Sequence, residues 1–137
     1  MYKIMDVNKI NISKVETHLN SIFDNTVSDN TFFGEMVGGE LIDSSWDDMV
    51  LIEVPTGIED MDAYGKGTVL VWLYAKPLLS GRKNVNVMSK LEQRLNNVLA
   101  NHSNTDGFYI KRRLTYTDYD SNIKWHCNIV ELQITIV

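Results

Sequence analysis

Two aspartates near the C-terminal end of the chain are its best candidate for a pair of catalytic acids. Asp118 and Asp120 stand two residues apart in "TDYD", and Lys124 and His126 follow them across an Asp-Ser-Asn turn. Residues i and i+2 of a strand lie on one face, so both carboxylates would point the same way. Two acids beside a basic group are typical of a metal-dependent nuclease. The tip of a hairpin does not exclude water, however, and we expect ordinary turn chemistry there.

The histidines and the single cysteine do not provide a nucleophile and its base. His126 and Cys127 are adjacent in "WHC", so a strand would place them on opposite faces. His18 precedes an apolar helical position, and His102 has no Cys or Asp at metal-ligand spacing. The sequence therefore predicts no catalytic residue, no metal site and no cofactor. We expect the protein not to be an enzyme.

A cluster of acids occupies the segment "TGIEDMDAYGKG", residues 56–67. Glu59, Asp60 and Asp62 suggest calcium, but the D-x-[DN]-x-[DN]-G order and the distal glutamate of a calcium loop are missing. Glycines near both ends favour a polar surface loop. We therefore expect a solvated acidic loop and no metal.

The basic residues gather at two places. Arg82 and Lys83 lie in the "SGRKN" connection, and Lys111, Arg112 and Arg113 follow one another in a predicted strand. Adjacent strand residues face opposite ways, which divides the second group. The connection has one glycine and does not match the phosphate-binding pattern G-x-x-x-x-G-K-[ST]. It is predicted to be an exposed basic corner, suited to docking rather than catalysis.

Length and composition limit the number of domains and the classes of partner. The chain has 137 residues, 44% hydrophobic and 23% charged, which suits a single globular domain over 1–137. A net charge of -5 disfavours a general nucleic-acid binder. No apolar run reaches the roughly 20 residues that span a bilayer, and the start lacks the apolar core of a signal peptide. We expect no membrane partner, no specific nucleic acid and a cytosolic site of synthesis.

Hydrophobic periodicity predicts the elements that must position these side chains. Apolar residues at spacings of three and four indicate amphipathic helices near 12–24 and 85–101. The fold class is predicted to be α+β, a mainly antiparallel sheet with the two helices packed on one face. The strands are expected near residues 32–37, 48–55, 68–76, 108–119 and 123–137.

Two strands carry unusual patterns. In "TVLVWLYAK" both faces are apolar, which is typical of a central strand covered on both sides, or of one whose outer face meets another protein. In the last strand the apolar set changes from odd to even positions near Ile129. A shift by one position exchanges the faces, so we expect a β-bulge near Ile129.

The layout resembles a known family. The segments "DDMVLIEVP", "GTVLVWLYAKP", "GRKN", "VMSKLEQRLNNVL" and "IVELQITIV", after an N-terminal helix, look like the tail terminator or tail-completion (head-tail joining) proteins of long-tailed phages. The similarity spans nearly the whole chain. It lies in the order of the elements and in the residue pattern "YAKP…M..LE..L". It implies a homo-oligomeric ring, commonly a hexamer, that caps the tail tube and meets the head connector. It also implies assembly in the bacterial host cytoplasm, a place in the virion and no catalytic residues.

A head-to-tail ring requires two different patches on each subunit. The acidic loop is predicted to face basic groups of a neighbour. The residues of this predicted interface are Glu59, Asp60, Asp62, Arg82, Lys83 and Arg113. The alternative function is a small homo-oligomeric α+β binding or regulatory module that dimerises through its sheet, and a third option is a metal-dependent nuclease.

Overall fold

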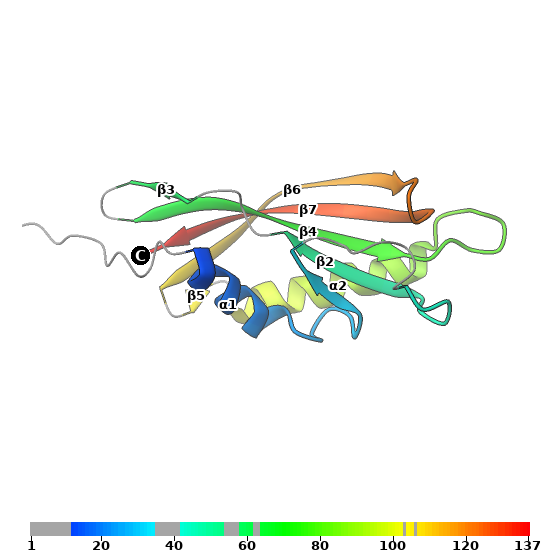
Figure 1. Cartoon of the computed structure of the whole chain (residues 1–137), viewed down its shortest axis with the longest axis horizontal. Helices are drawn as coiled ribbons and strands as arrows, with labels where there is room; N and C mark the ends of the chain where they lie inside the picture. The colour runs from blue at the N-terminus through cyan, green and yellow to red at the C-terminus, as the bar shows by residue number, and fades with distance from the viewer. Residues whose placement is uncertain (1–11, 35–41, 54–57, 62–63, 103, 106) are drawn as a thin grey trace, which may run out of the picture.

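A computed structural model describes residues 12–34, 42–53, 58–61, 64–102, 104–105 and 107–137. Within them the helices are α1 (Ile12–Phe23) and α2 (Val85–His102) (Figure 1). The strands are β1 (Thr31–Phe33), β2 (Asp48–Glu53), β3 (Glu59–Asp60), β4 (Gly65–Ala75), β5 (Asn104–Thr105), β6 (Phe108–Asp120) and β7 (Trp125–Ile136).

The strands form one mixed sheet in the order β1-β2-β4-β7-β6-β5, with β3 paired to the beginning of β4. Only the β1–β2 pair is parallel among the described strands, and the other pairs are antiparallel. The α+β class predicted from the sequence is therefore confirmed, with two helices and a mostly antiparallel sheet. β4 lies between β2 and β7, which confirms that this strand is central.

The segment predicted to be an acidic loop is partly strand. β3 pairs with β4 through Glu59 opposite Lys66 and Asp60 opposite Gly65, and β4 begins earlier than predicted. Gly65 and Gly67 lie within β4 rather than in a loop, because tertiary pairing supplies the ladder hydrogen bonds that local propensity does not favour. Asp62 lies outside the described residues, as does the predicted strand beyond Gly34.

The predicted β-bulge near Ile129 is wrong. β7 pairs with β4 in unbroken register over its whole length, so its side chains alternate without interruption. The register shift lies in the neighbouring strand β6, between Arg112 and Leu114. The apolar set of β7 changes parity because its two ends bury opposite faces, with Cys127 and Ile129 on one side and Leu132 and Ile134 on the other.

Two apolar clusters occupy the two faces of the sheet. The alternation of β4 separates them as predicted, with Val69, Val71, Leu73 and Ala75 in one cluster and Tyr74 in the other. We call the two sides the Val71 face and the Trp72 face. The Val71 cluster includes side chains of both helices, among them Leu19, Phe23, Leu91, Leu95 and Val98.

The Trp72 cluster is smaller and contains no described residue of α1 or α2. Its buried members are Met49, Leu51, Tyr74, Trp125, Cys127 and Ile129. Ile42 and Trp46, from the segment before β2, are partly buried against it. This face is therefore covered in part by loop residues.

Candidate functional site

The connection between β4 and α2, residues 77–84, has a defined shape. The Leu78 N–H donates to the carbonyl of Arg82 at 2.9 Å, and the Gly81 N–H donates to the carbonyl of Leu78 at 2.8 Å. Gly81 has φ 83°, a left-handed conformation that a residue without Cβ adopts readily. The sequence prediction of a corner at this junction is correct in its location, and the corner is a tight turn.

Side chains tie this turn to the sheet. The Lys83 ammonium donates to Thr117 Oγ1 at 3.0 Å and to Asn128 Oδ1 at 2.6 Å. His126 Nε2 lies 3.1 Å from the carbonyl oxygen of Gly81. Lys83 therefore anchors the connection to β6 and β7 and is half-buried, which is a different role from the exposed interface charge predicted for it.

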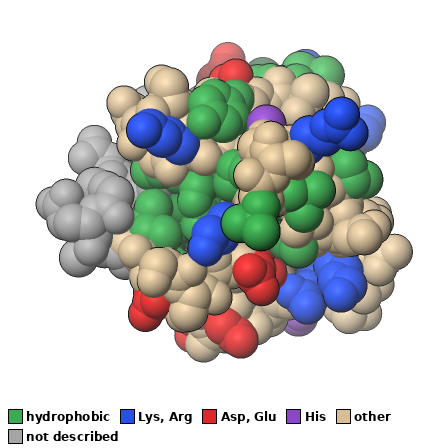
Figure 2. All heavy atoms as spheres, turned by 90° about the vertical axis from the view of Figure 1, so that its right-hand side faces the viewer, with side chains coloured by type: hydrophobic (Ala, Val, Ile, Leu, Met, Phe, Trp, Pro, Cys, Tyr) green, Lys and Arg blue, Asp and Glu red, His purple; other side chains and the backbone are tan. Residues whose placement is uncertain are grey.

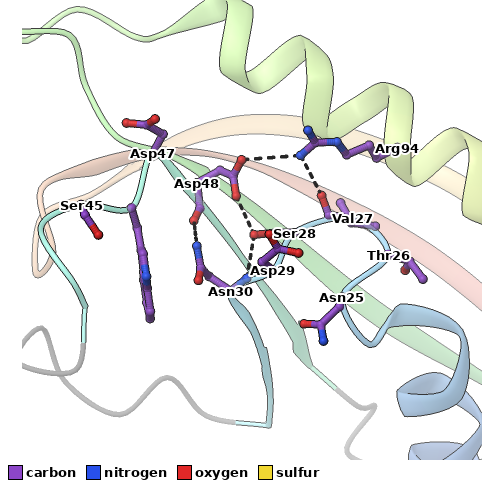
Figure 3. Close-up of a pocket in the computed structure, with 11 residues that line it drawn as sticks. Asn25, Thr26, Val27, Ser28, Asp29, Asn30, Ser45, Asp47, Asp48 and Arg94 are labelled. Carbon is purple, nitrogen blue, oxygen red and sulfur yellow. Dashed lines mark hydrogen bonds and ion pairs between the residues drawn. The ribbon is translucent and has the colours of Figure 1, made fainter.

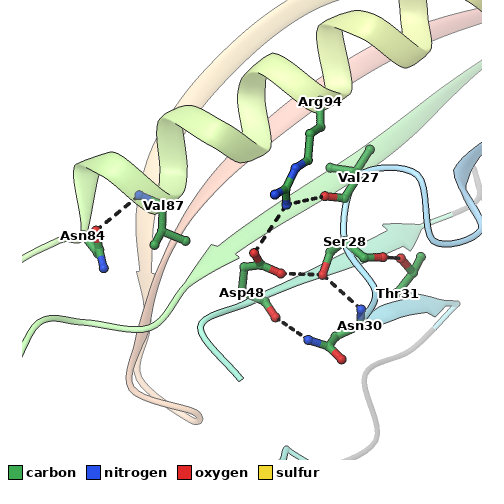
Figure 4. A network of polar contacts seen from close by, with 8 residues as sticks. All are labelled: Val27, Ser28, Asn30, Thr31, Asp48, Asn84, Val87 and Arg94. Atoms are coloured by element: carbon green, nitrogen blue, oxygen red, sulfur yellow. Dashed lines mark hydrogen bonds and ion pairs between the residues drawn. The ribbon is translucent and has the colours of Figure 1, made fainter. Parts of the chain in front are cut away.

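The end of the connection also caps α2. Asn84 Oδ1 accepts a hydrogen bond from the Val87 N–H at 3.2 Å, and the Asn84 carbonyl accepts one from Met88 at 3.0 Å (Figure 4). An N-cap of this kind satisfies an N–H that the first turn of a helix leaves unpaired. The connection is thus fixed at its beginning, its middle and its end.

Two leucines project from this fixed turn. Leu79 is fully exposed, and Leu78 is 47% exposed. Figure 2 looks onto this end of the molecule and shows hydrophobic side chains at its surface, interspersed with Lys and Arg. We call Leu78 and Leu79 the leucine knob. Exposed leucines on an ordered turn are a candidate contact surface, because they gain from burial without further ordering of the chain.

A second exposed apolar surface lies on the Trp72 face. The strand registers place five side chains in one row across the sheet, which we call the apolar band. Its members, from β6 to β1, are Tyr116, Ile129, Trp72, Leu51 and Phe32. Trp46 packs on Phe32 with ring centroids 6.0 Å apart, so loop residues cover the β1 end of the band. At the β6 end, Tyr116 is 45% exposed and Leu114 beside it is 52% exposed.

Acidic residues flank the band on the same face. Asp118 pairs in register with Cys127, and Asp120 pairs with Trp125, so both carboxylates lie on the Trp72 face as their spacing predicted. Asp120 accepts a hydrogen bond from the Tyr74 hydroxyl at 3.2 Å, and Asp118 is exposed. Their surroundings are an open sheet surface rather than a closed cleft.

These acids and the burial of this face shift two neighbouring pKa values. Burial, together with the negative charges of Asp118 and Asp120, raises the pKa of the Cys127 thiol to about 11. Burial and the charge of Asp120 raise the pKa of the Tyr74 hydroxyl well above its usual value. A neutral, buried thiol is a poor nucleophile, and His126 lies on the other face of β7 as predicted.

A polar pocket of about 540 Å³ lies between the α1–β1 loop, the start of β2 with the segment before it, and Arg94 of α2 (Figure 3). Arg94 Nη1 lies 3.7 Å from Asp48 Oδ2 and donates to the Val27 carbonyl at 3.3 Å. The Ser28 hydroxyl donates to Asp48 Oδ1 at 2.6 Å, and the Asn30 amide donates to the Asp48 carbonyl at 3.0 Å. Figure 4 shows these contacts as one network that joins the α1–β1 loop to β2 and α2.

Sequence reasoning did not find this network. Its residues are spread over the α1–β1 loop, the start of β2 and the middle of α2, so no local spacing signals it. The contacts satisfy the polar groups of the buried Ser28 and hold the chain together at this point. Its carboxylate and guanidinium are engaged with each other, and we assign the pocket no ligand.

The predicted interface residues are distributed over the molecule. Glu59 is exposed on β3, and Arg82 is exposed in the connection beyond the other end of β4. The strand rise makes this separation roughly 30 Å, so the structure does not bring them together within one subunit. Arg113 lies at the register shift of β6, 3.8 Å from Glu131. Asp60 belongs to β3, beside Glu59.

The described residues contain neither a group of metal ligands nor a helix that could span a membrane. No three side chains of His, Cys, Asp or Glu are grouped there as metal ligands would be. In the same part of the chain, neither helix has the length and apolarity needed to cross a membrane. In comparisons with known proteins, no protein-family model matches the chain, and no curated protein matches it.

Proposed function

We propose that the protein is a structural subunit of a ring at the end of a phage tail or at the head-tail junction, as in tail terminator proteins. The observation that carries the proposal is the exposure of apolar side chains on two ordered parts of the subunit, the leucine knob and the β6 end of the apolar band. Exposed apolar surface on an ordered domain is typical of a protein that assembles. The order of helix, strands, helix and hairpin supports the resemblance on which the ring rests.

In this proposal both helices pack as amphipathic elements on the Val71 face, and the Trp72 face serves assembly. The Val71 cluster, which contains Leu19 of α1 and Leu91 of α2, supports this arrangement. The ring is a homo-oligomer, hexameric as in the family it resembles. Its partners are the tail tube and the head connector proteins, and its place is in the virion after assembly in the host cytoplasm.

The positions of the charges also support a head-to-tail contact between subunits. Of the three predicted basic residues, Lys83 and Arg113 have partners within the subunit, whereas Arg82 has no side-chain partner among the described residues. Glu59 and Arg82 stand at opposite ends of β4, so they can meet only between copies. A contact between two different patches generates a closed ring or an open filament.

The protein is not an enzyme in this proposal. Asp118 and Asp120 share a face, but they lie on an open surface, and one of them is engaged by Tyr74. The second candidate function is a small binding or regulatory module that dimerises through the Trp72 face. Exposure of Leu114 and Tyr116 favours it, because a two-fold dimer would bury the same apolar surface on both copies.

The experiment is to examine the purified protein by negative-stain electron microscopy and to measure its mass by light scattering across a salt series. A ring predicts annular particles and a mass of several subunits that falls as salt rises, since exposed charges are screened beyond roughly 10 Å at 0.1 M. Arg82→Glu should lower the mass, and Lys90→Glu on the exposed side of α2 is the control. A dimer whose mass is indifferent to salt would contradict the ring and favour the second candidate.

A further inference from the structure

We propose that the leucine knob and Arg82 of one copy dock on the β6 end of the apolar band of a second copy, beside Asp118. This inference rests on the proposed ring and deepens it, because it names the surface that receives each connection. The occupant is a second copy of this chain, and the contact joins one end of a subunit to the sheet face of its neighbour.

A subunit cannot cover its own band with its own knob. Lys83 ties the connection to Thr117 and Asn128. Asn128 pairs in register with Leu73, so its side chain projects from the Val71 face, and Thr117 pairs with Asn128. The band lies on the opposite face of the same strands. Only another molecule can bring a knob to it.

The two surfaces are matched in chemistry. The knob offers two leucine side chains on a turn that is already ordered, so docking costs little further conformational entropy. The receiving surface offers Leu114 and Tyr116 of β6 and the indole of Trp72 on β4, which lie on one face of the sheet with Ile129 of β7 between Tyr116 and Trp72. Aromatic side chains with exposed edges are common anchors at protein interfaces.

The charges beside the two surfaces are complementary. Arg82 closes the same turn that presents the knob and is exposed, with no side-chain partner among the described residues. Asp118 follows Tyr116 by two residues on the same strand face, a distance of roughly 7 Å. Among the described residues, the one hydrogen bond to its carboxylate comes from the adjacent Tyr119 N–H, at 2.8 Å. Glu59, the partner predicted from the sequence, stands opposite Lys66 in the β3–β4 pair and already has a neighbouring cation.

This contact is heterologous, because an end of one subunit meets a face of the next. An open chain of subunits therefore keeps one unused surface at each of its two ends until the ring closes. A two-fold dimer through the Trp72 face would instead consume the same surface on both copies. The two arrangements therefore respond differently to variants that remove one surface at a time.

The test uses two full-length variants, each lacking one surface. The knob variant carries Leu79→Ser and Arg82→Glu, and the band variant carries Tyr116→Ser and Asp118→Arg. All four side chains are exposed, so both variants should fold, which their circular dichroism and melting temperatures verify. By sedimentation velocity each should be monomeric alone, and an equimolar mixture should form a dimer and nothing larger, because one intact knob meets one intact band.

Single substitutions measure the contact. Leu79→Ser should weaken association by roughly tenfold to a hundredfold, the loss expected when one leucine side chain is no longer buried. Tyr116→Ser should weaken it at least about tenfold. Tyr109→Ser is the matched control, since this tyrosine is on the same face of β6 and 43% exposed, yet lies at the other end of the strand. It should leave association unchanged.

A charge exchange identifies the partner of Arg82. Combining Arg82→Glu with Asp118→Arg in one chain should restore the association that Arg82→Glu weakens. If association is restored instead by combining Arg82→Glu with Glu59→Arg, the docking on the band is overturned. That result would support the acidic strand β3 as the receiving surface. Both outcomes keep the head-to-tail ring.

Four further results would overturn the docking. A knob variant that dimerises alone would show a two-fold sheet contact, and a mixture of the two variants that stays monomeric would show that knob and band do not meet. Wild-type protein that is monomeric at every accessible concentration would also exclude it. Annular particles formed by Leu79→Ser at wild-type concentrations would overturn the docking while leaving the proposed function in place.

Discussion

The two faces of the sheet have similar apolar sequences and different coverage. On the Val71 face, side chains of both helices complete a buried cluster, and Leu95 and Leu132 are fully buried. On the Trp72 face, Ile42 and Trp46 from the segment before β2 cover part of the cluster, and Leu114 and Tyr116 of β6 are exposed. Apolar alternation alone therefore does not distinguish a fully covered face from a partly exposed one.

The difference in coverage between the two faces also occurs within the single strand β7. Its first half buries Trp125, Cys127 and Ile129 on the Trp72 face, and its second half buries Leu132 and Ile134 on the Val71 face. The strand is regular throughout, so the change reflects what lies above and below each half. We expect substitutions on the two faces to separate into losses of folding stability and losses of association.

The largest effect on stability is expected for Leu95→Ala on the Val71 face. Leu95 is fully buried, so its truncation removes apolar contacts and leaves a cavity, at a cost of about 2 to 5 kcal/mol in the free energy of unfolding. Urea denaturation measures the loss, and the exposed Gln93→Ala on the same helix is the control. An unchanged midpoint would show that α2 does not pack through this side chain.

A smaller loss is expected for Asp48→Ala at the border of the Val71 face. The change removes the acceptor of the Ser28 hydroxyl, which is 3% exposed, and the cost of such an unpaired group is about 1 to 3 kcal/mol. The exposed Arg94 adds little through its ion pair. The neighbouring Asp47→Ala, also exposed, serves as the control in the same urea experiment. Equal losses for both variants would contradict the role of the network.

The pH dependence of stability tests the burial of the Trp72 face. The folded state raises the pKa of Cys127 from 9.0 to about 11, so the unfolded state releases the thiol proton first. The stabilisation is therefore fully present below pH 9 and is lost as pH rises toward about 11. Urea midpoints between pH 8 and pH 11 should fall less steeply in Cys127→Ala than in the wild type. Urea midpoints that fall equally steeply with pH in both proteins would show that the Cys127 thiol is not buried away from solvent.

The smallest effect on stability is expected at the β6 end of the apolar band. Leu114→Ser and Tyr116→Ser replace exposed side chains, and each should change the free energy of unfolding by no more than about 0.5 kcal/mol. The measurement is made at a protein concentration where the wild type is monomeric, so that association does not contribute. A loss of unfolding free energy comparable to that of Leu95→Ala would show that these side chains stabilise the fold as the buried residues of the Val71 face do.

The sequence by itself determined the elements whose periodicity is strong. The stripe containing Leu91 and Leu95 specified α2, and the two-sided apolar run of β4 specified a central strand, because side-chain period follows directly from backbone geometry. It also placed Asp118 and Asp120 on one face and separated His126 from Cys127. These inferences depend only on residues close together in the chain.

Tertiary structure alone decided the pairings between distant segments. The parallel β1–β2 pair, the short strand β3 and the register shift in β6 depend on which strands meet, and a local sequence window does not contain that information. Lys83 shows the consequence for a candidate site. Its sequence neighbours indicated an exposed charge, but Thr117 and Asn128, which are distant in the chain, bind its ammonium group. Arg82, one residue earlier, remains exposed because the turn directs it to solvent.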